Sequence, residues 1–150
     1  MKRTTQTSSR SETIELACKL GILLTEPITI LLRGDLAAGK TTFVQGLAKG
    51  LDITSKVSSP TFTIMKVHKG RLPLYHIDAY RLEDIDQDLG FEEYVLSDDG
   101  VCVVEWPDYV SNLLPIERLE LMISVVNEDT RIIEVSAVGD KYIALLEKWL

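Results

Sequence analysis

The sequence lacks any apolar run long enough to span a membrane. Its apolar stretches are short, and Ile28–Leu32 and Val101–Val104 are typical, whereas a membrane-spanning helix needs about 18 or more apolar residues. The segment that follows Lys2 and Arg3 consists of threonine, glutamine and serine, without the apolar region that a signal peptide requires. The sequence therefore predicts a cytoplasmic protein that is neither exported nor inserted into a membrane.

Cysteine and histidine are also scarce. The two cysteines, Cys18 and Cys102, lie far apart in apolar surroundings, as expected of buried thiols in a reducing compartment. Two histidines and two cysteines at these spacings make no zinc site. A chain of 150 residues is long enough to bury a core without a disulfide or a metal, and its length predicts a single domain over residues 1–150.

Basic charge is the third scarcity. The net charge is −7, and the stretch 76–108 holds eleven acidic residues against one basic residue, Arg81, so the rest of the chain carries +3. A protein that binds nucleic acid by itself carries a basic surface that this chain does not have. If an RNA is involved, a partner protein is expected to supply most of the phosphate contacts.

The pattern of apolar residues predicts both helices and strands. Ser9 and Glu12 resemble a capping box that opens the first helix, and Gly50 is expected to end the second helix in the left-handed conformation. The turn signals at residues 69–70 and 127–129 each predict a hairpin. The predicted helices are residues 12–24, 41–49 and 142–149, with a further acidic helical stretch before residue 101, and the predicted strands are residues 28–33, 62–67, 72–78, 101–105, 119–126 and 131–138.

The residues from Gly34 to Thr41 read G-D-L-A-A-G-K-T, which fits the P-loop pattern G-x-x-x-x-G-K-[ST]. In this loop the glycines allow successive backbone N–H groups to face the phosphates, and the following helix adds the positive end of its dipole. Because the motif follows a predicted strand and opens a predicted helix, the match is in the right context. The fold class predicted is α/β, a P-loop NTPase-like three-layer sandwich with a mixed central sheet.

Two acidic residues are candidates for the Mg²⁺ ligand that a P-loop requires on another strand. Asp78 ends the segment 74–78, which reads L-Y-H-I-D, and Glu105 ends the segment 101–105, which reads V-C-V-V-E. Glu105 fits better, because four apolar residues precede it without interruption. Lys40 is expected to reach the β- and γ-phosphates, and Thr41 to place its hydroxyl on Mg²⁺.

Two further features distinguish between classes of P-loop protein. The sequence contains no Asn-Lys-x-Asp, so guanine selectivity of the GTPase kind is unsupported. Between Lys40 and Glu105 the arginines are Arg71 and Arg81, and neither stands in a recognisable arginine-finger position. A small-molecule kinase, which usually closes an arginine-bearing lid over the phosphates, is therefore the weaker alternative.

Four blocks of residues, taken in order, resemble the bacterial TsaE (YjeE-type) ATPases of tRNA threonylcarbamoyladenosine synthesis. A fifth element, G-F-E-E-Y at residues 90–94, is also similar to that family, and the one departure is Ala37, where the family usually has glycine. An alanine fits a phosphate loop if its φ is negative. The four blocks are G-D-L-A-A-G-K-T-T (34–42), S-P-T-F-T-I (59–64), Y-H-I-D-A-Y-R-L (75–82) and V-E-W-P (104–107).

This resemblance implies a nucleotide site. It places Arg131 beside the nucleotide, and Arg10 where the N-terminal segment meets the adenine. ATP or ADP is the implied cofactor together with Mg²⁺, which Thr41 and Glu105 would hold. The implied phosphate-binding residues are Ala37, Ala38, Gly39, Lys40, Thr41 and Thr42.

The resemblance also implies the catalytic residues. Asp78 is similar to the family's second acidic residue, which would arrange the attacking water or a metal-bound water. Thr61 is similar to a switch residue that senses the γ-phosphate, and Lys40 completes the set. Trp106 is interpreted as a packing aromatic at the end of the Glu105 strand, and His76 as a core or switch-region histidine rather than a ligand.

The leading hypothesis is a weak ATPase that acts with TsaB and TsaD in modifying adenosine 37 of tRNAs that read ANN codons. The tRNA is expected to be met only indirectly, through the complex. The alternatives are a P-loop small-molecule kinase and a nucleotide-dependent interaction module with little turnover.

Overall fold

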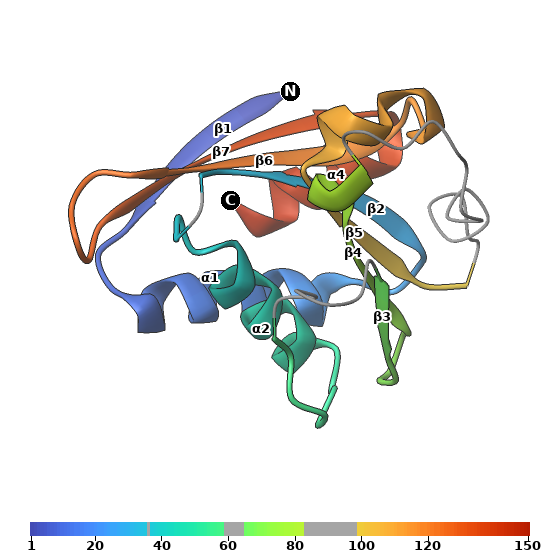
Figure 1. Ribbon diagram of the computed structural model, residues 1–150, viewed down its shortest axis with the longest axis horizontal. Helices are drawn as coiled ribbons and strands as arrows, with labels where there is room; N and C mark the ends of the chain where they lie inside the picture. The colour runs from blue at the N-terminus through green and yellow to red at the C-terminus, as the bar shows by residue number, and fades with distance from the viewer. Residues whose placement is uncertain (36, 59–64, 83–98) are drawn as a thin grey trace.

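The computed structural model describes residues 1–35, 37–58, 65–82 and 99–150. In these residues a seven-stranded sheet is accompanied by three α-helices and two 3-10 segments (Figure 1). No described helix is long and apolar enough to cross a bilayer. In chain order the elements are β1 (Lys2–Thr7), α1 (Arg10–Leu23), β2 (Ile28–Arg33), α2 (Lys40–Gly50), β3 (Met65–His68), β4 (Leu74–Asp78), η1 (Ala79–Leu82), β5 (Val101–Glu105), η2 (Pro107–Leu113), β6 (Arg118–Val125), β7 (Arg131–Val138) and α4 (Asp140–Trp149).

The strands lie in the order β1-β7-β6-β2-β5-β4-β3. At the centre, β2 pairs in parallel with β5 and with β6, and β4 pairs in parallel with β5. The outer pairs β1–β7, β6–β7 and β3–β4 are antiparallel. The sheet is therefore mixed, which confirms the predicted α/β fold. Because the central strands are parallel, the carboxyl ends of β2, β4, β5 and β6 meet at one edge, where α/β sheets bind their ligands.

Alternation along β2 separates two apolar clusters, one on each face of the sheet. Ile30 and Leu32 belong to the larger cluster, which also contains buried side chains of α1, α2 and α4. Leu31 points to the opposite face, where η2 supplies Val110 to the smaller cluster. The α-helices thus cover one face (Figure 1), and η1 and η2 lie over the other face near β5 and β2.

Helices α1 and α2 cross at glycines. A Cβ added to Gly21 would lie 2.5 Å from the carbonyl oxygen of Leu47, and one added to Gly50 would strike the carbonyl of Cys18. The prediction that Gly50 ends its helix in the left-handed conformation is wrong. Gly50 is the last residue of α2, and the positive φ falls on Asp52 at 60°. Glycine is required here because α1 packs too closely for a side chain, and not because the backbone is left-handed.

The strands of the central sheet and the hairpins match the prediction closely. The ranges of β2 and β5 are as predicted, and the two hairpins form at the predicted turns. The first helix begins at Arg10 rather than residue 12, with the Ser9 hydroxyl accepting a hydrogen bond from the Glu12 N–H. Strand β1 was not predicted, and it exists through its pairing with β7 at the far end of the chain. The predicted acidic helix and residues 62–64 of the predicted strand 62–67 lie outside the described residues.

Candidate functional site: a phosphate loop with two strand-end carboxylates

The predicted phosphate loop joins the end of β2 to the start of α2. Gly34 and Gly39 both have positive φ, at 153° and 108°. A Cβ on Gly34 would lie 2.8 Å from the carbonyl oxygen of Ile123, so glycine is required there by both conformation and space. The loop delivers Lys40 and Thr41 to the first turn of α2, where unpaired N–H groups and the helix dipole favour an anion.

Ala37 has a φ of 67°. From the sequence, the fit of an alanine was conditional on a negative φ, and that condition is not met. A side chain in the left-handed region costs roughly 1–2 kcal/mol relative to glycine, because Cβ approaches the following carbonyl oxygen. Ala37 therefore adopts the backbone geometry of a glycine, and the loop carries the strain.

The side chain of Lys40 packs on the phosphate loop and on Trp106. Its Nζ donates a hydrogen bond to the carbonyl oxygen of Gly34 at 2.5 Å and lies 4.0 Å from the ring centre of Trp106. Burial lowers the pKa of Lys40, and the charges of Glu105, Asp78 and Asp35 act in the opposite direction. The ammonium is thus held close to both candidate metal ligands.

Trp106 itself is in an unusual conformation. Its φ is 56°, in the left-handed region, and its ring packs on Tyr80 and Tyr109 with centroids 5.1 and 6.3 Å away. The sequence interpretation of Trp106 as a packing aromatic missed its second contact, the cation–π interaction with Lys40. A strained non-glycine residue at a site is a sign of function when its contacts explain it.

Asp78 and Glu105 are register partners at the ends of the parallel strands β4 and β5. Burial raises the pKa of Asp78, as does the negative charge of Glu105, while a hydrogen bond from the Tyr80 N–H at 3.0 Å acts to lower it. Two carboxylates this close repel each other unless a cation lies between or near them. The structure therefore brings together both acids that the sequence singled out.

Glu105 has a buried partner that sequence reasoning missed. Nε2 of His76 lies 2.5 Å from Oε2 of Glu105, and the residues are 0% and 3% exposed. Among the described residues, no group forms a hydrogen bond with Nδ1 of His76. The signal was available in the sequence, because His76 and Asp78 are two residues apart on a strand and so share one face.

Arg10 and Arg131, which the resemblance assigned to the nucleotide, lie around one cavity next to the loop. Nε of Arg131 donates to the carbonyl oxygen of Ala38 at 2.9 Å, and its Nη1 donates to three carbonyls of the β6–β7 turn. Arg10 donates to the Gln45 side chain at 2.7 Å. The cavity has a volume of about 310 Å³ and is lined by Ser9, Arg10, Thr13, Ala37, Gly39, Thr42, Glu128, Asp129 and Arg131.

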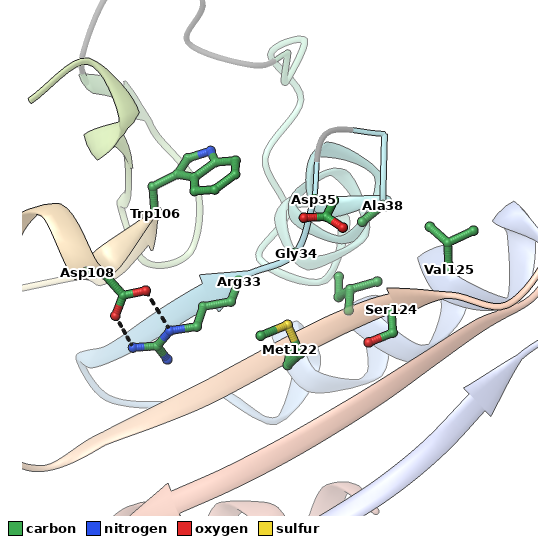
Figure 2. Close-up of a pocket in the computed structure, with 10 residues that line it drawn as sticks. Arg33, Gly34, Asp35, Ala38, Trp106, Asp108, Met122, Ser124 and Val125 are labelled. Atoms are coloured by element: carbon green, nitrogen blue, oxygen red, sulfur yellow. Dashed lines mark hydrogen bonds and ion pairs between the residues drawn. The ribbon is translucent and has the colours of Figure 1, made fainter. Parts of the chain in front are cut away.

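A second cavity of about 450 Å³ lies along β2 and β6 and shares Gly34, Asp35 and Ala38 with the loop (Figure 2). Arg33 and Asp108 both line it and form an ion pair, with 3.1 Å between Nη2 and Oδ1 (Figure 2). A second contact of 3.5 Å joins Arg33 to Glu120. The first pair ties the end of β2 to the segment after Trp106, and the second ties it to β6. No sequence pattern predicted them.

Thr61 and the G-F-E-E-Y element at 90–94 lie outside the described residues, so their predicted roles stay predictions. Within the described ranges, no three His, Cys, Asp or Glu side chains gather to hold a metal by themselves. A Mg²⁺ site in a P-loop protein does not need such a cluster, since one or two carboxylates act together with water and the substrate phosphates.

A family model, known proteins and a solved structure each match this chain over most of its length. Residues 7–133 match the family described as "Threonylcarbamoyl adenosine biosynthesis protein TsaE". A protein of Bacillus subtilis (strain 168) named tRNA threonylcarbamoyladenosine biosynthesis protein TsaE is 45% identical, over 99% of this chain and 94% of the relative. A protein of the same name from Treponema pallidum (strain Nichols) is 42% identical over 85% of this chain and 96% of the relative. The crystal structure of Bacillus subtilis YdiB superposes with a TM-score of 0.86 at 39% identity, covering 99% of this chain and 94% of that one.

Proposed function

The chain belongs to the TsaE family of tRNA threonylcarbamoyladenosine biosynthesis, and on that premise we propose that it binds and hydrolyses ATP. The observation that carries this proposal is the convergence of Lys40, Asp78 and Glu105 at the mouth of the phosphate loop. A buried ammonium beside two carboxylates suits a triphosphate with its cation. The loop glycines and the start of α2 supply the backbone donors.

Lys40 would move from Trp106 and the Gly34 carbonyl to the phosphates. Its current contacts are a ring face and one carbonyl oxygen, both weaker partners for an ammonium than a phosphate oxygen. In hydrolysis a water attacks the γ-phosphorus, the bond to the β-phosphate oxygen breaks, and ADP and phosphate leave. Asp78, half-buried at the strand end, is placed to orient that water, and Lys40 offsets the charge of the transferred group.

The residues fit a Mg²⁺ ion. Glu105 has a hydrogen bond on Oε2 and none on Oε1 among the described contacts, so one carboxylate oxygen is available, and Thr41 lies in the first turn of α2. When bound, Mg²⁺ neutralises charge on the β- and γ-phosphates. Glu105 and Thr41 would hold it, and Arg10 and Arg131 border the cavity that would receive the nucleoside.

The proposal extends to partners, TsaB and TsaD, with tRNA met only through the complex. The stretch 76–108 has a net charge of −10, which favours docking on a basic protein surface and disfavours direct contact with RNA. Docking of this kind weakens as salt rises, because exposed charges are screened within about 8–10 Å at physiological ionic strength.

Incubation with ATP labelled on the γ-phosphate tests the proposal. We expect slow release of free phosphate by the protein alone and faster release with TsaB and TsaD, with the stimulation falling as salt is raised. A labelled metabolite instead of phosphate would indicate a small-molecule kinase. Binding with neither product would indicate a nucleotide-dependent interaction module, and fast turnover unaffected by partners would contradict the proposed partnership.

A further inference from the structure

The buried contact between His76 and Glu105 is the feature that the proposed mechanism leaves unused. His76, Asp78 and Glu105 point to the same face of the sheet as Val103, which is the face covered by α2. His76 pairs with Val103, and Asp78 pairs with Glu105. The register partner of His76 is therefore two residues before Glu105 on β5, so the imidazole and the Glu105 carboxylate are diagonal neighbours. Diagonal side chains on one face of a sheet are within reach of each other.

The chemistry of the two groups determines the direction of the hydrogen bond. An ionised carboxylate only accepts, so Nε2 of His76 carries the hydrogen and donates to Oε2. Within the described residues Nδ1 has no partner, so Glu105 is the one hydrogen-bonding contact found for this ring. A completely buried imidazole with that single partner acts on the position of Glu105 and does not extend a larger hydrogen-bond network.

We propose that His76 is a positioning residue for Glu105: its Nε2–H fixes Oε2, so that Oε1 is the oxygen presented to the metal ion of the nucleotide. This inference rests on the proposed function, because it concerns the same Mg²⁺ site. Carboxylates that ligate metals are commonly held by a second hydrogen bond, and loss of such a partner costs about 10- to 100-fold in metal affinity.

Two substitutions of similar polarity separate this role from packing. The amide nitrogen of glutamine can reach the position of Nε2, whereas that of asparagine is too short and reaches only the position of Nδ1. We therefore expect His76→Gln to retain the contact with Glu105 and His76→Asn to lose it.

The measurement is ADP affinity by calorimetry as a function of MgCl₂ concentration. For His76→Asn we expect the Mg²⁺ concentration needed for half of the metal-dependent gain to rise about 10- to 100-fold, with affinity in EDTA unchanged. His76→Gln should stay near the native protein. In the Glu105→Gln background, His76→Asn should add no further loss, because the residue that it acts through has been changed.

Three results would overturn the proposal. His76→Asn could keep the native Mg²⁺ requirement, or it could lose ADP binding equally with and without Mg²⁺, or it could weaken metal binding as much in the Glu105→Gln background. The proposed function fails separately, if the native protein binds no ATP or ADP at all.

A measurement on the native chain covers the case in which His76→Asn does not fold. Nitrogen-15 NMR of the labelled histidines reports which ring nitrogen bears the hydrogen. We expect an Nε2-protonated, hydrogen-bonded ring for His76 both before and after addition of Mg²⁺ and ADP. A ring protonated on Nδ1 alone would remove the donor that the proposal requires.

Discussion

The ammonium of Lys40 lies 4.0 Å from the ring centre of Trp106, so the lysine that should hold the phosphates rests on an aromatic face. The tryptophan adopts a positive φ of 56° to stand there. A desolvated cation–π contact is worth about 2 kcal/mol or more. A phosphate must compete with that contact, so nucleotide binding and the environment of Trp106 are linked.

Tryptophan fluorescence provides the first prediction. The protein has two tryptophans, Trp106 and Trp149, and Trp149 is buried in the core, 1% exposed. In the variant Trp149→Phe, addition of ATP should change the emission of Trp106, because the ammonium leaves its ring. The variant Trp106→Phe, with Trp149 as its reporter, is the control and should show little change. If both variants responded equally to ATP, the fluorescence change would not come from the Lys40–Trp106 contact, and the prediction would be wrong.

The second prediction concerns the charge of Lys40. Lys40→Ala should lower ATP affinity about tenfold or more, since a hydrogen bond to a charged group is worth about 1.5–3 kcal/mol. Lys49→Ala, at the exposed end of the same helix, should leave ATP affinity unchanged. Calorimetry gives the affinities, and circular dichroism checks that both variants fold. Unchanged affinity in Lys40→Ala would argue against a phosphate loop.

A third prediction follows from the positive φ of Ala37. Ala37→Gly stabilises the folded state by about 1–2 kcal/mol, because left-handed strain is removed. It also costs about 0.4–1 kcal/mol of stability, because glycine raises the conformational entropy of the unfolded chain. We expect the free energy of unfolding in urea to rise by up to about 1.6 kcal/mol. Ala38 is buried and has no positive φ, so Ala38→Gly should destabilise the protein instead. A loss of stability in both variants would mean that Ala37 is not strained.

The fourth prediction separates the two carboxylates. Glu105→Gln should weaken Mg²⁺-dependent nucleotide binding while ADP affinity without metal changes little. Asp78→Asn should lower the rate of hydrolysis more than it lowers binding, because Asp78 is proposed to act on the water. Titration of both variants with Mg²⁺, with ATP turnover measured in parallel, compares them. If the two effects were exchanged, the two roles would be reversed.

The fifth prediction concerns pH. The pKa of Asp78 is raised above its usual 3.8 in the folded chain, first by burial and then by the charge of Glu105. The folded state therefore holds this proton more tightly than the unfolded state, and the stability that this proton contributes is present at low pH and lost as pH rises through the raised pKa. Asp78→Asn should consequently unfold at higher urea concentration than the native protein at pH 7. The difference should shrink as pH falls through the raised pKa and vanish below the usual value of 3.8, and a constant difference would contradict the raised pKa.

The sequence alone determined the features that depend on local spacing. The phosphate loop was legible because its glycines and Lys40 stand at set intervals after an apolar run, and the ranges of β2 and β5 followed from uninterrupted apolar residues. The two hairpins were legible because glycine and asparagine mark their turns. Asp78 and Glu105 could be paired as candidates because each ends a strand expected to lie in the same sheet.

The tertiary structure decided what depends on contacts between distant segments. Strand β1 exists through its pairing with β7, more than a hundred residues away, and Arg10 and Arg131 meet around one cavity through the same closure of the chain. The contact of His76 with Glu105 depends on the register of β4 against β5, which no local pattern encodes. Likewise, glycine is required at position 50 because α1 packs closely there, and the positive φ of Ala37 is set by the path of the loop. Local patterns specify how each segment folds, but register, helix contact and loop path are settled only when the segments pack together.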